Sequence, residues 1–229
     1  MNRTKIEWCD YTWNPIKGLC PENCKLPDGK SYCYARRMYQ RFGWPKGLSL
    51  LSGLVGKYGR PPAGSRIFVC STMEMFHPDI PGGWRDWIFE EIEEYPELTF
   101  IILTKRPERI DRAMPDNVWL GVSVTGFEDY AKKIFLMKQR AKVRFISYEP
   151  MLTAVPPELF HGLDWAILGR LTGRGKKHDP SPMSLAIYKS HICGMGIPLF
   201  IKNNLKGIRP GPLIQKFPKP AKEKTGVVL

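Results

Sequence analysis

Several features of membrane and secreted proteins are missing from this sequence. It contains no run of about eighteen apolar residues, so no segment is predicted to span a bilayer. The first residues lack the apolar stretch of a signal peptide, which predicts a cytoplasmic protein. No internal repeat is present, and His161, His178 and His191 show no ligand spacing with one another. The sequence therefore predicts a single-domain protein of the cytoplasm.

Acidic residues are also scarce. The 229 residues contain 22 Asp and Glu against 35 Lys and Arg, a formal net charge of +13. Such an excess favours an anionic partner, and nucleic acid is the commonest one. A generally basic surface or a nucleotide-like substrate is the alternative. The densest basic run, Lys216 to Lys224, lies in a C-terminal tail that we place at residues 216–229, after one domain spanning residues 1–215.

Short apolar runs alternate with helical patterns along the chain. Several of the runs are continuously apolar, which is typical of parallel strands that are buried on both faces. The segment Phe42–Gly64 is rich in Gly and Pro and is predicted to be an insertion, either a lid or a connector. Helices are predicted from Cys33 onward and at Trp84–Tyr95, Phe127–Arg140 and Ser184–Gly194. Strands are predicted at Tyr11–Ile16, Arg66–Ser71, Thr99–Thr104, Val118–Val124, Val143–Ser147, Trp165–Leu168 and Pro198–Ile201.

This alternation predicts an α/β fold with a parallel sheet. Polar residues follow almost every predicted strand, for example Glu74, Lys105, Ser123 and Glu149. A (β/α) barrel builds its active site in this way, from the carboxyl ends of many strands, whereas an open doubly wound sheet concentrates it at one switch point. We therefore expect a single-domain, TIM-like (β/α) barrel, either partial or closed.

Three of the six cysteines are crowded into one loop after the first predicted strand. Cys20, Cys24 and Cys33 are unlikely partners for disulfides in a reducing compartment and are better explained as metal ligands. Three ligands leave one position open on a tetrahedral metal or on one iron of a cubane cluster. The spacing does not match zinc ribbons or fingers, so an iron–sulfur cluster is favoured over zinc. Cys9 would close a zinc site if it were a fourth ligand; we expect it, like Cys70 and Cys193, to be a non-ligand.

Blocks of sequence that carry a family resemblance occur in order along most of the chain: Thr4–Trp8, Thr12–Pro15, the turn from Gly18 to Cys20, Cys33–Ala35, Leu103–Arg109, Asn117–Ser123, Ser147–Met151, Asp164–Trp165 and Pro198–Lys202. Together they resemble a phage-associated three-cysteine-motif family of unassigned function. Its members look like radical S-adenosylmethionine (SAM) proteins, which are barrels with a [4Fe–4S] cluster held by three cysteines after the first strand. The resemblance therefore implies a radical-SAM-like fold, that cluster and SAM as cofactors, and a reductant protein as a partner.

The resemblance also implies roles for residues at the strand ends. Cys20, Cys24 and Cys33 would hold the cluster, and Glu74 would accept a hydrogen bond from the SAM ammonium. Lys105 or Arg106 would pair with the SAM carboxylate, and an arginine suits bidentate pairing better. Ser123 and Glu149 would reach the ribose hydroxyls. Arg170, Lys202 and His77 are further candidates for a catalytic role.

Each of these roles has a structural alternative. Glu74 and Glu149 could form internal salt bridges with Lys105 or Lys202 across the mouth of the barrel. Ser123 could satisfy only backbone groups, and His77 precedes a proline and could be a turn residue. Exposed aromatic rings stack on nucleic-acid bases, and Trp13 and Trp44 are the candidates for exposure, whereas Trp84 and Trp87 fit core packing.

The chain departs from the family pattern at two places. Eight residues separate Cys24 from Cys33, where the family keeps its last two cysteines close together. Arg170 stands in a turn where relatives tend to have an acid, which bears on the substrate and on the chemistry.

We expect a radical-SAM-type enzyme that acts on a nucleic acid or nucleotide. The alternatives are a non-catalytic protein that binds zinc or a structural cluster and interacts with nucleic acid, and a degenerate barrel that binds SAM without radical chemistry.

Overall fold

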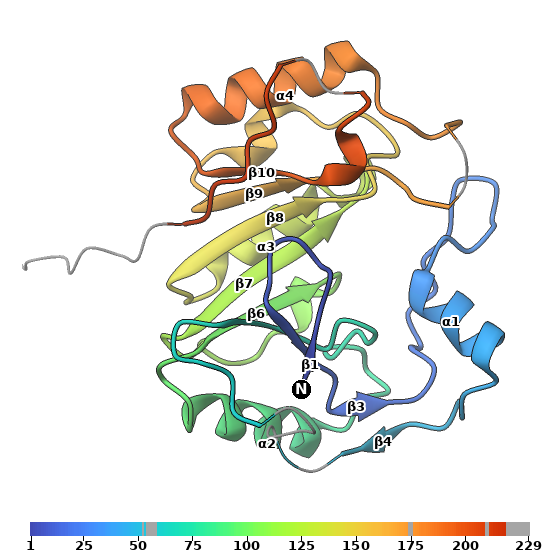
Figure 1. The fold of residues 1–229 in the computed structure, drawn as a ribbon, viewed down its shortest axis with the longest axis vertical. Helices are drawn as coiled ribbons and strands as arrows, with labels where there is room; N and C mark the ends of the chain where they lie inside the picture. Colours follow the sequence, from blue (N-terminus) through green and yellow to red (C-terminus); the bar gives the residue numbers. More distant parts are fainter. Residues whose placement is uncertain (52, 54–58, 174–175, 209–210, 219–229) are drawn as a thin grey trace, which may run out of the picture.

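An eight-stranded sheet forms the centre of the molecule (Figure 1). The computed structural model describes residues 1–51, 53, 59–173, 176–208 and 211–218. Neighbouring strands of the sheet are parallel, except that β1 runs antiparallel to β2. In spatial order the strands are β1 (Asn2–Arg3), β2 (Tyr11–Trp13), β5 (Arg66–Val69), β6 (Thr99–Thr104), β7 (Val118–Val124), β8 (Val143–Tyr148), β9 (Trp165–Leu168) and β10 (Leu199–Ile201).

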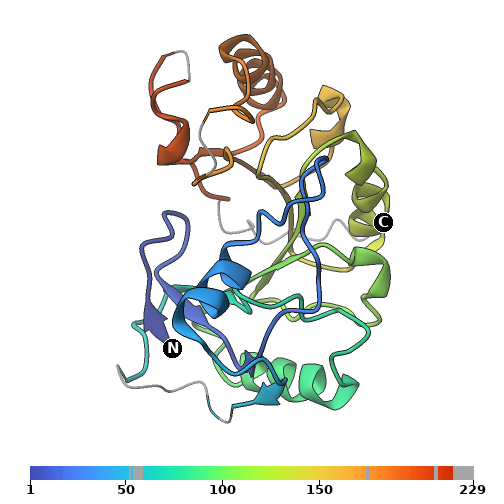
Figure 2. The same cartoon turned by 90° about the vertical axis from the view of Figure 1, so that its right-hand side faces the viewer.

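Three helices cover one face of the sheet, and a fourth lies apart from them. Helices α2 (Gly82–Glu93), α3 (Ala131–Lys138) and α4 (Pro182–Gly194) lie around one face of the sheet, whereas α1 (Tyr34–Phe42) lies beside the carboxyl ends of the strands (Figures 1 and 2). In the described part of the chain, no helix has the length and apolar character needed to cross a membrane. The remaining elements are the antiparallel pair β3 (Ile16–Lys17) and β4 (Ser49–Leu50) and the 3₁₀ turns η1 (Pro107–Arg109), η2 (Phe127–Asp129), η3 (Pro157–Phe160) and η4 (Asn203–Leu205).

The α/β class and the parallel sheet are confirmed, but a closed barrel is not found. Each parallel strand is added beside the strand that precedes it in the sheet, without a reversal of order, and no pairing joins β1 to β10. The outer side of β10 pairs in antiparallel fashion with the segment around Gln215, through a bridge between Phe200 and Gln215. The sheet is therefore open. Three strands, β6, β7 and β9, have the bounds predicted from the sequence.

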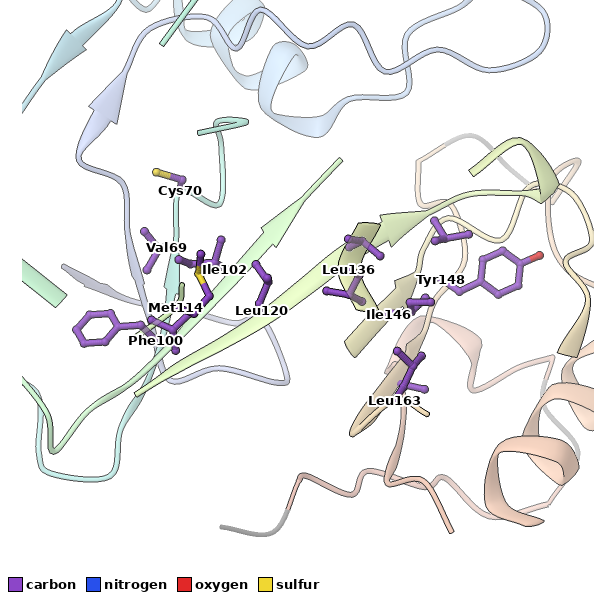
Figure 3. Packing of buried hydrophobic residues seen from close by; sticks show 14 of the residues in the cluster. Val69, Cys70, Phe100, Ile102, Met114, Leu120, Leu136, Ile146, Tyr148 and Leu163 are labelled. Atoms are coloured by element: carbon purple, nitrogen blue, oxygen red, sulfur yellow. The ribbon is translucent and has the colours of Figure 1, made fainter. Parts of the chain in front are cut away.

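Apolar side chains are buried on both faces of the sheet, as the continuous apolar runs predict. On the helix-covered face, Phe100 and Ile102 alternate with Ile101, which belongs to a second cluster on the opposite face. In Figure 3, Leu136 of α3 lies beside Ile146 of β8. The second cluster comprises Trp8, Cys9, Phe68, Ile101, Phe145, Trp165, Ile167 and Phe200.

Two segments near the chain ends connect the open edges of the sheet. The Glu7 carboxylate, in the loop between β1 and β2, accepts a 2.7 Å hydrogen bond from the backbone amide of Asn203, which follows β10. Phe217 packs against Trp165 and lies under the Arg66 guanidinium, 3.9 Å from it, so it joins β9 to β5. Residues from opposite edges of the sheet are therefore tied together without strand pairing between β1 and β10.

Some local predictions are wrong. Trp13 is buried rather than exposed, because it faces Trp87 and Phe100 in the core. The spacing of Phe127, Tyr130, Ile134 and Met137 predicts one stripe of a single helix, but Phe127 and Ile134 are exposed and the buried residue of α3 is Leu136, because η2 and α3 are separate elements. Cys193 is predicted to be a core residue near the end of a helix, but it is exposed.

The predicted insertion and tail lie partly outside the described residues. In Phe42–Gly64, residues 52 and 54–58 are outside, and the described remainder contains β4 and lines none of the cavities around the cysteine loop. In the predicted tail 216–229, residues 219–229 are outside. Lys216 and Phe217 belong to the packed domain, because the Trp165 indole donates a 2.8 Å hydrogen bond to the Lys216 carbonyl.

Candidate functional site

A cavity of about 400 Å³ lies at the carboxyl ends of the parallel strands. All three cysteines of the loop line it, and so do residues at the carboxyl ends of six neighbouring strands, β5 to β10. Its boundary on the sheet side includes apolar and aromatic side chains, among them Trp8, Phe68 and Leu103. The predicted site residues that line this cavity are Cys20, Cys24, Cys33, Glu74, Lys105, Ser123, Glu149, Arg170 and Lys202.

The eight residues between Cys24 and Cys33 fold back on themselves. Lys25 and Ser31 form an antiparallel bridge, and the Tyr32 amide donates a 3.1 Å hydrogen bond to the Cys24 carbonyl. Leu26 is buried and anchors the loop. The long gap therefore returns Cys33 to the side of Cys24, and the departure from the family spacing does not separate the thiols.

Cys33 occupies the N-cap of α1, where its sulfur accepts a hydrogen bond from the Arg36 amide at 3.5 Å. A hydrogen bond from the Cys24 thiol, helped by these helix amides, lowers the pKa of Cys33 to about 5. The same thiol pair raises the pKa of Cys24, which keeps the proton. Burial raises the pKa of Cys20, although the Glu74 amide donates to its sulfur at 3.3 Å. Without a bound cation, one thiolate and two thiols are therefore expected here.

Two charged residues hold the cysteine loop in place. The Arg106 guanidinium donates a 2.6 Å hydrogen bond to the carboxylate of Glu22, which lies between Cys20 and Cys24. The Arg36 guanidinium donates to the carbonyl of Cys20 at 3.0 Å. Arg106, predicted to bind a cofactor carboxylate, is thus paired with the protein and lines a neighbouring cavity of about 260 Å³. Sequence reasoning missed Glu22, although an acid between two candidate ligands was a visible signal.

Glu74 connects the end of β5 to the end of β6. Its Oε1 accepts hydrogen bonds from the Thr104 hydroxyl at 2.6 Å and the Phe76 amide at 3.2 Å, and its Oε2 accepts from the Lys105 amide at 2.7 Å. A carboxylate oxygen can accept two hydrogen bonds, so Oε2 keeps one position for a further donor.

The Lys105 ammonium lines both cavities. Burial alone would lower its pKa, but the surrounding acidic groups, Cys24, Glu74, Cys20 and Cys33, together outweigh burial and raise the pKa of Lys105. In the part of the chain that the structure describes, no carboxylate forms an ion pair with it. Lys105 is therefore a cation held close to the thiols, whereas Arg106 is neutralised by Glu22.

Glu149 forms the salt bridge that was considered as its structural alternative. The Lys202 ammonium donates to Glu149 Oε1 at 2.5 Å, and the Asn204 amide group lies 3.4 Å from the same oxygen. Gly169 makes room for this carboxylate, since a Cβ atom there would lie 2.6 Å from Glu149 Cδ. Glu149 Oε2 accepts no hydrogen bond from the residues described. Ser123 is buried at the end of β7 and lines both cavities.

The other two candidates differ in position. Arg170 lines the cavity, and its guanidinium pairs with Asp179 at 2.7 Å. His77 lines neither cavity. Its Nδ1 accepts a 3.2 Å hydrogen bond from the Asp79 amide, which is the turn arrangement considered as its alternative.

The two buried cysteines outside the loop, Cys9 and Cys70, differ in their position relative to the cavity. Burial raises the pKa of both Cys9 and Cys70 to about 12. Cys9 lies in the second apolar cluster and does not line the cavity, whereas Cys70 does. Among the residues that the structure describes, no three His, Cys, Asp or Glu side chains converge as ligands of one metal ion. The sulfur ligands of a single zinc ion all lie about 2.3 Å from that ion. The sulfur ligands of a cubane cluster bind different iron atoms, so they lie farther apart from one another.

Two residues that line the cavity, Trp8 and Arg170, each carry a buried nitrogen with no hydrogen-bond partner among the described residues. The Trp8 indole is 3% exposed and lines the cavity, yet its Nε1–H donates to no described group. A buried donor without an acceptor is costly, about 1–3 kcal/mol, so it indicates a ligand with an acceptor atom.

One family model matches the part of the chain that contains these residues. The model, described as a protein of unknown function (DUF5131), matches residues 3–203. The chain belongs to this family. The matched range includes every predicted site residue from Cys20 to Lys202, and the family description assigns no activity to them. Comparison with curated proteins and with solved structures gave no significant match. The phage association and the likeness to radical SAM proteins remain predictions.

Proposed function

We propose that the chain is a radical-SAM-type enzyme that holds a [4Fe–4S] cluster through Cys20, Cys24 and Cys33. The observation that supports it is the single cavity in which these thiols meet polar residues from the ends of six parallel strands. The proposed fold is a partial (β/α) barrel, which builds its active site at this end, and the sequential order of the parallel strands supports it. The radical-SAM-like fold and the cluster belong to the proposal.

The donor set fits an iron–sulfur cluster. Thiolates are its ligands, and Cys33 is already favoured as a thiolate at a helix N-terminus. Lys105 adds a positive charge beside the thiols and so opposes the charge of a thiolate-bound cluster. When bound and reduced, such a cluster supplies the electron that cleaves SAM into methionine and a 5′-deoxyadenosyl radical.

The chain's own residues would bind and orient SAM. Lys105 is the cation for the SAM carboxylate, because Arg106 is paired with Glu22. Glu74 Oε2 can accept one hydrogen bond from the SAM ammonium, and Glu149 Oε2 can accept one from a ribose hydroxyl. Ser123 is the neutral donor at the same rim. The net charge of +13 favours a nucleic acid or nucleotide as the substrate.

The metal content tests the proposal. Purified without oxygen, the protein should be brown and contain about four irons per chain. Cys24→Ser should lose this iron, whereas Cys193→Ser should keep it, because Cys193 is exposed on α4. With dithionite, the loaded protein should release 5′-deoxyadenosine from SAM. A colourless protein with a single zinc would contradict the proposal and favour the non-catalytic alternative. Methyl transfer without 5′-deoxyadenosine would indicate SAM binding without radical chemistry.

A further inference from the structure

We propose that helix α1 and the turn after it bind single-stranded nucleic acid and lead it to the cavity. We call this surface the α1 face and define it by the side chains of Arg37, Arg41, Phe42, Trp44 and Lys46. The inference deepens the proposed function, since it names the substrate class and the place where it docks. It concerns binding alone and can be tested without the cluster.

Charge is segregated around the α1 face. Residues 29–73 contain no Asp or Glu. Arg41 and Lys46 are exposed, Arg37 is half-buried, and none of the three forms an ion pair with a described carboxylate. A patch of unneutralised cations attracts a phosphate backbone. The Lys and Arg residues of 29–73 are Lys30, Arg36, Arg37, Arg41, Lys46, Lys57, Arg60 and Arg66.

Two aromatic rings project from this basic surface. Phe42 is 54% exposed and Trp44 is 40% exposed, and the two rings are stacked at 5.3 Å with an interplanar angle of 21°. The backbone produces this pair, because Gly43 caps α1 with a left-handed φ of 61° and turns Trp44 back onto Tyr39. Stacked aromatic rings beside cations are the elements that bind single-stranded nucleic acid without reading its sequence.

The α1 face is continuous with the cavity. Tyr34, Ala35 and Arg37, at the beginning of α1, line the cavity, and Phe42 is the last residue of the helix. Figure 2 shows α1 across the front of the molecule, beside the strand ends. A strand bound along α1 would therefore reach the cavity.

Another exposed aromatic ring lacks the same charge. Phe127 is 66% exposed, but the residues that follow it in η2, Glu128 and Asp129, are acidic rather than basic. Phe127 therefore provides a matched control for the aromatic residues of the α1 face.

The test is fluorescence anisotropy of labelled single-stranded DNA and RNA, each about 15 nucleotides long, with the full chain purified without iron and without SAM. The two arms distinguish the two nucleic acids. Trp44→Ala should weaken binding by about 5-fold or more, because it removes a stacking partner. Arg41→Gln should weaken binding and reduce the slope of log affinity against log salt concentration by about one. Phe127→Ala should bind like the unchanged protein, and circular dichroism should show that every variant is folded.

Several outcomes would overturn the inference. These are no binding at about 0.1 M salt, equal binding by Trp44→Ala and the unchanged protein, or equal affinity for a duplex of the same length, which would show a general electrostatic effect. If the α1 face binds a partner protein instead of nucleic acid, addition of the chain will leave the anisotropy of the oligonucleotide unchanged, and this result would also overturn the inference. Oligonucleotide binding through the α1 face in a protein that takes up no iron would support the inference while contradicting the proposed function.

Discussion

At the scale of single residues, the two neighbouring cations Lys105 and Arg106 have different tasks. They are adjacent in sequence and both were candidates for the SAM carboxylate. Arg106 is paired with Glu22 and so fastens the cysteine loop to the end of β6, whereas Lys105 lies between the thiols and Glu74. Which of the two cations is available to the SAM carboxylate depends on Glu22, a residue far from both in sequence.

Substitution of each cation separates these roles. We expect Lys105→Met to weaken SAM binding by the iron-loaded protein about tenfold or more, because a charge-assisted hydrogen bond is lost. Arg106→Gln should change SAM affinity by less than about twofold, since the Arg106 guanidinium is already bound to Glu22 and does not reach the SAM carboxylate. Equilibrium dialysis with labelled SAM measures both. A larger effect of Arg106→Gln would contradict the assignment.

Gly169 is a second residue whose role comes from its neighbours. Gly169→Ala places a Cβ 2.6 Å from Glu149 Cδ, so the carboxylate must move away from Lys202. We expect the free energy of unfolding to fall by about 1–3 kcal/mol, as in other overpacked sites. Gly194→Ala is the control, because nothing lies within 4 Å of a Cβ at the end of α4, and it should raise stability by about 0.5 kcal/mol. Urea unfolding measures both, and equal stability of the two variants would contradict the expectation.

At the scale of elements, an ion pair fixes the beginning of β2 to the beginning of β5. The Asp10 carboxylate accepts hydrogen bonds from the backbone amide of Arg66 at 2.8 Å and from its guanidinium at 3.1 Å. Burial alone would raise the pKa of Asp10, but the bonds from Arg66 outweigh burial and lower it.

The stability that this pair provides depends on pH. Because the pKa of Asp10 is lower in the folded state, the contribution is fully present above the unfolded value of about 3.9 and is lost as pH falls through the folded pKa. Asp10→Asn should therefore lower the free energy of unfolding by up to about 1 kcal/mol at neutral pH and by much less near pH 2. Urea unfolding at the two pH values checks this. Asp86→Asn, in the exposed pair with Arg112, should have a smaller effect at neutral pH. An equal effect of Asp10→Asn at both pH values would count against the linkage.

At the scale of the whole molecule, an open sheet is stabilised by segments that connect its edges. Phe217 contacts Trp165 and Phe200 and lies under the Arg66 guanidinium, so it joins both sides of the face opposite the helices. Glu7 makes a similar connection to the residues after β10.

Removal of the Phe217 ring tests this arrangement. We expect Phe217→Ala to lower the free energy of unfolding by about 2 kcal/mol, less than for a fully buried ring because Phe217 is half-buried. The exposed Phe127→Ala should change it by less than about 0.5 kcal/mol. Thermal and urea unfolding measure the difference. No loss of stability in Phe217→Ala would mean that residues up to Phe217 are part of the tail, as the sequence predicts.

The sequence by itself determined the periodic features of this protein. Continuous apolar runs such as Thr99–Thr104 and Val118–Val124 predict buried parallel strands, because both faces of such strands must be apolar. The polar residues that follow them could be assigned to one end of the sheet, since parallel strands end at the same edge.

The tertiary structure alone decided which of these groups meet. Whether the sheet closes depends on curvature and edge packing, which no periodicity encodes. The return of Cys33 to Cys24 depends on the bridge between Lys25 and Ser31, and the difference between Lys105 and Arg106 depends on Glu22, which is distant in sequence and pairs with Arg106. These contacts join residues far apart in the chain, so their energies appear only when the fold brings them together. The cavity around the three cysteines is therefore a property of the tertiary structure.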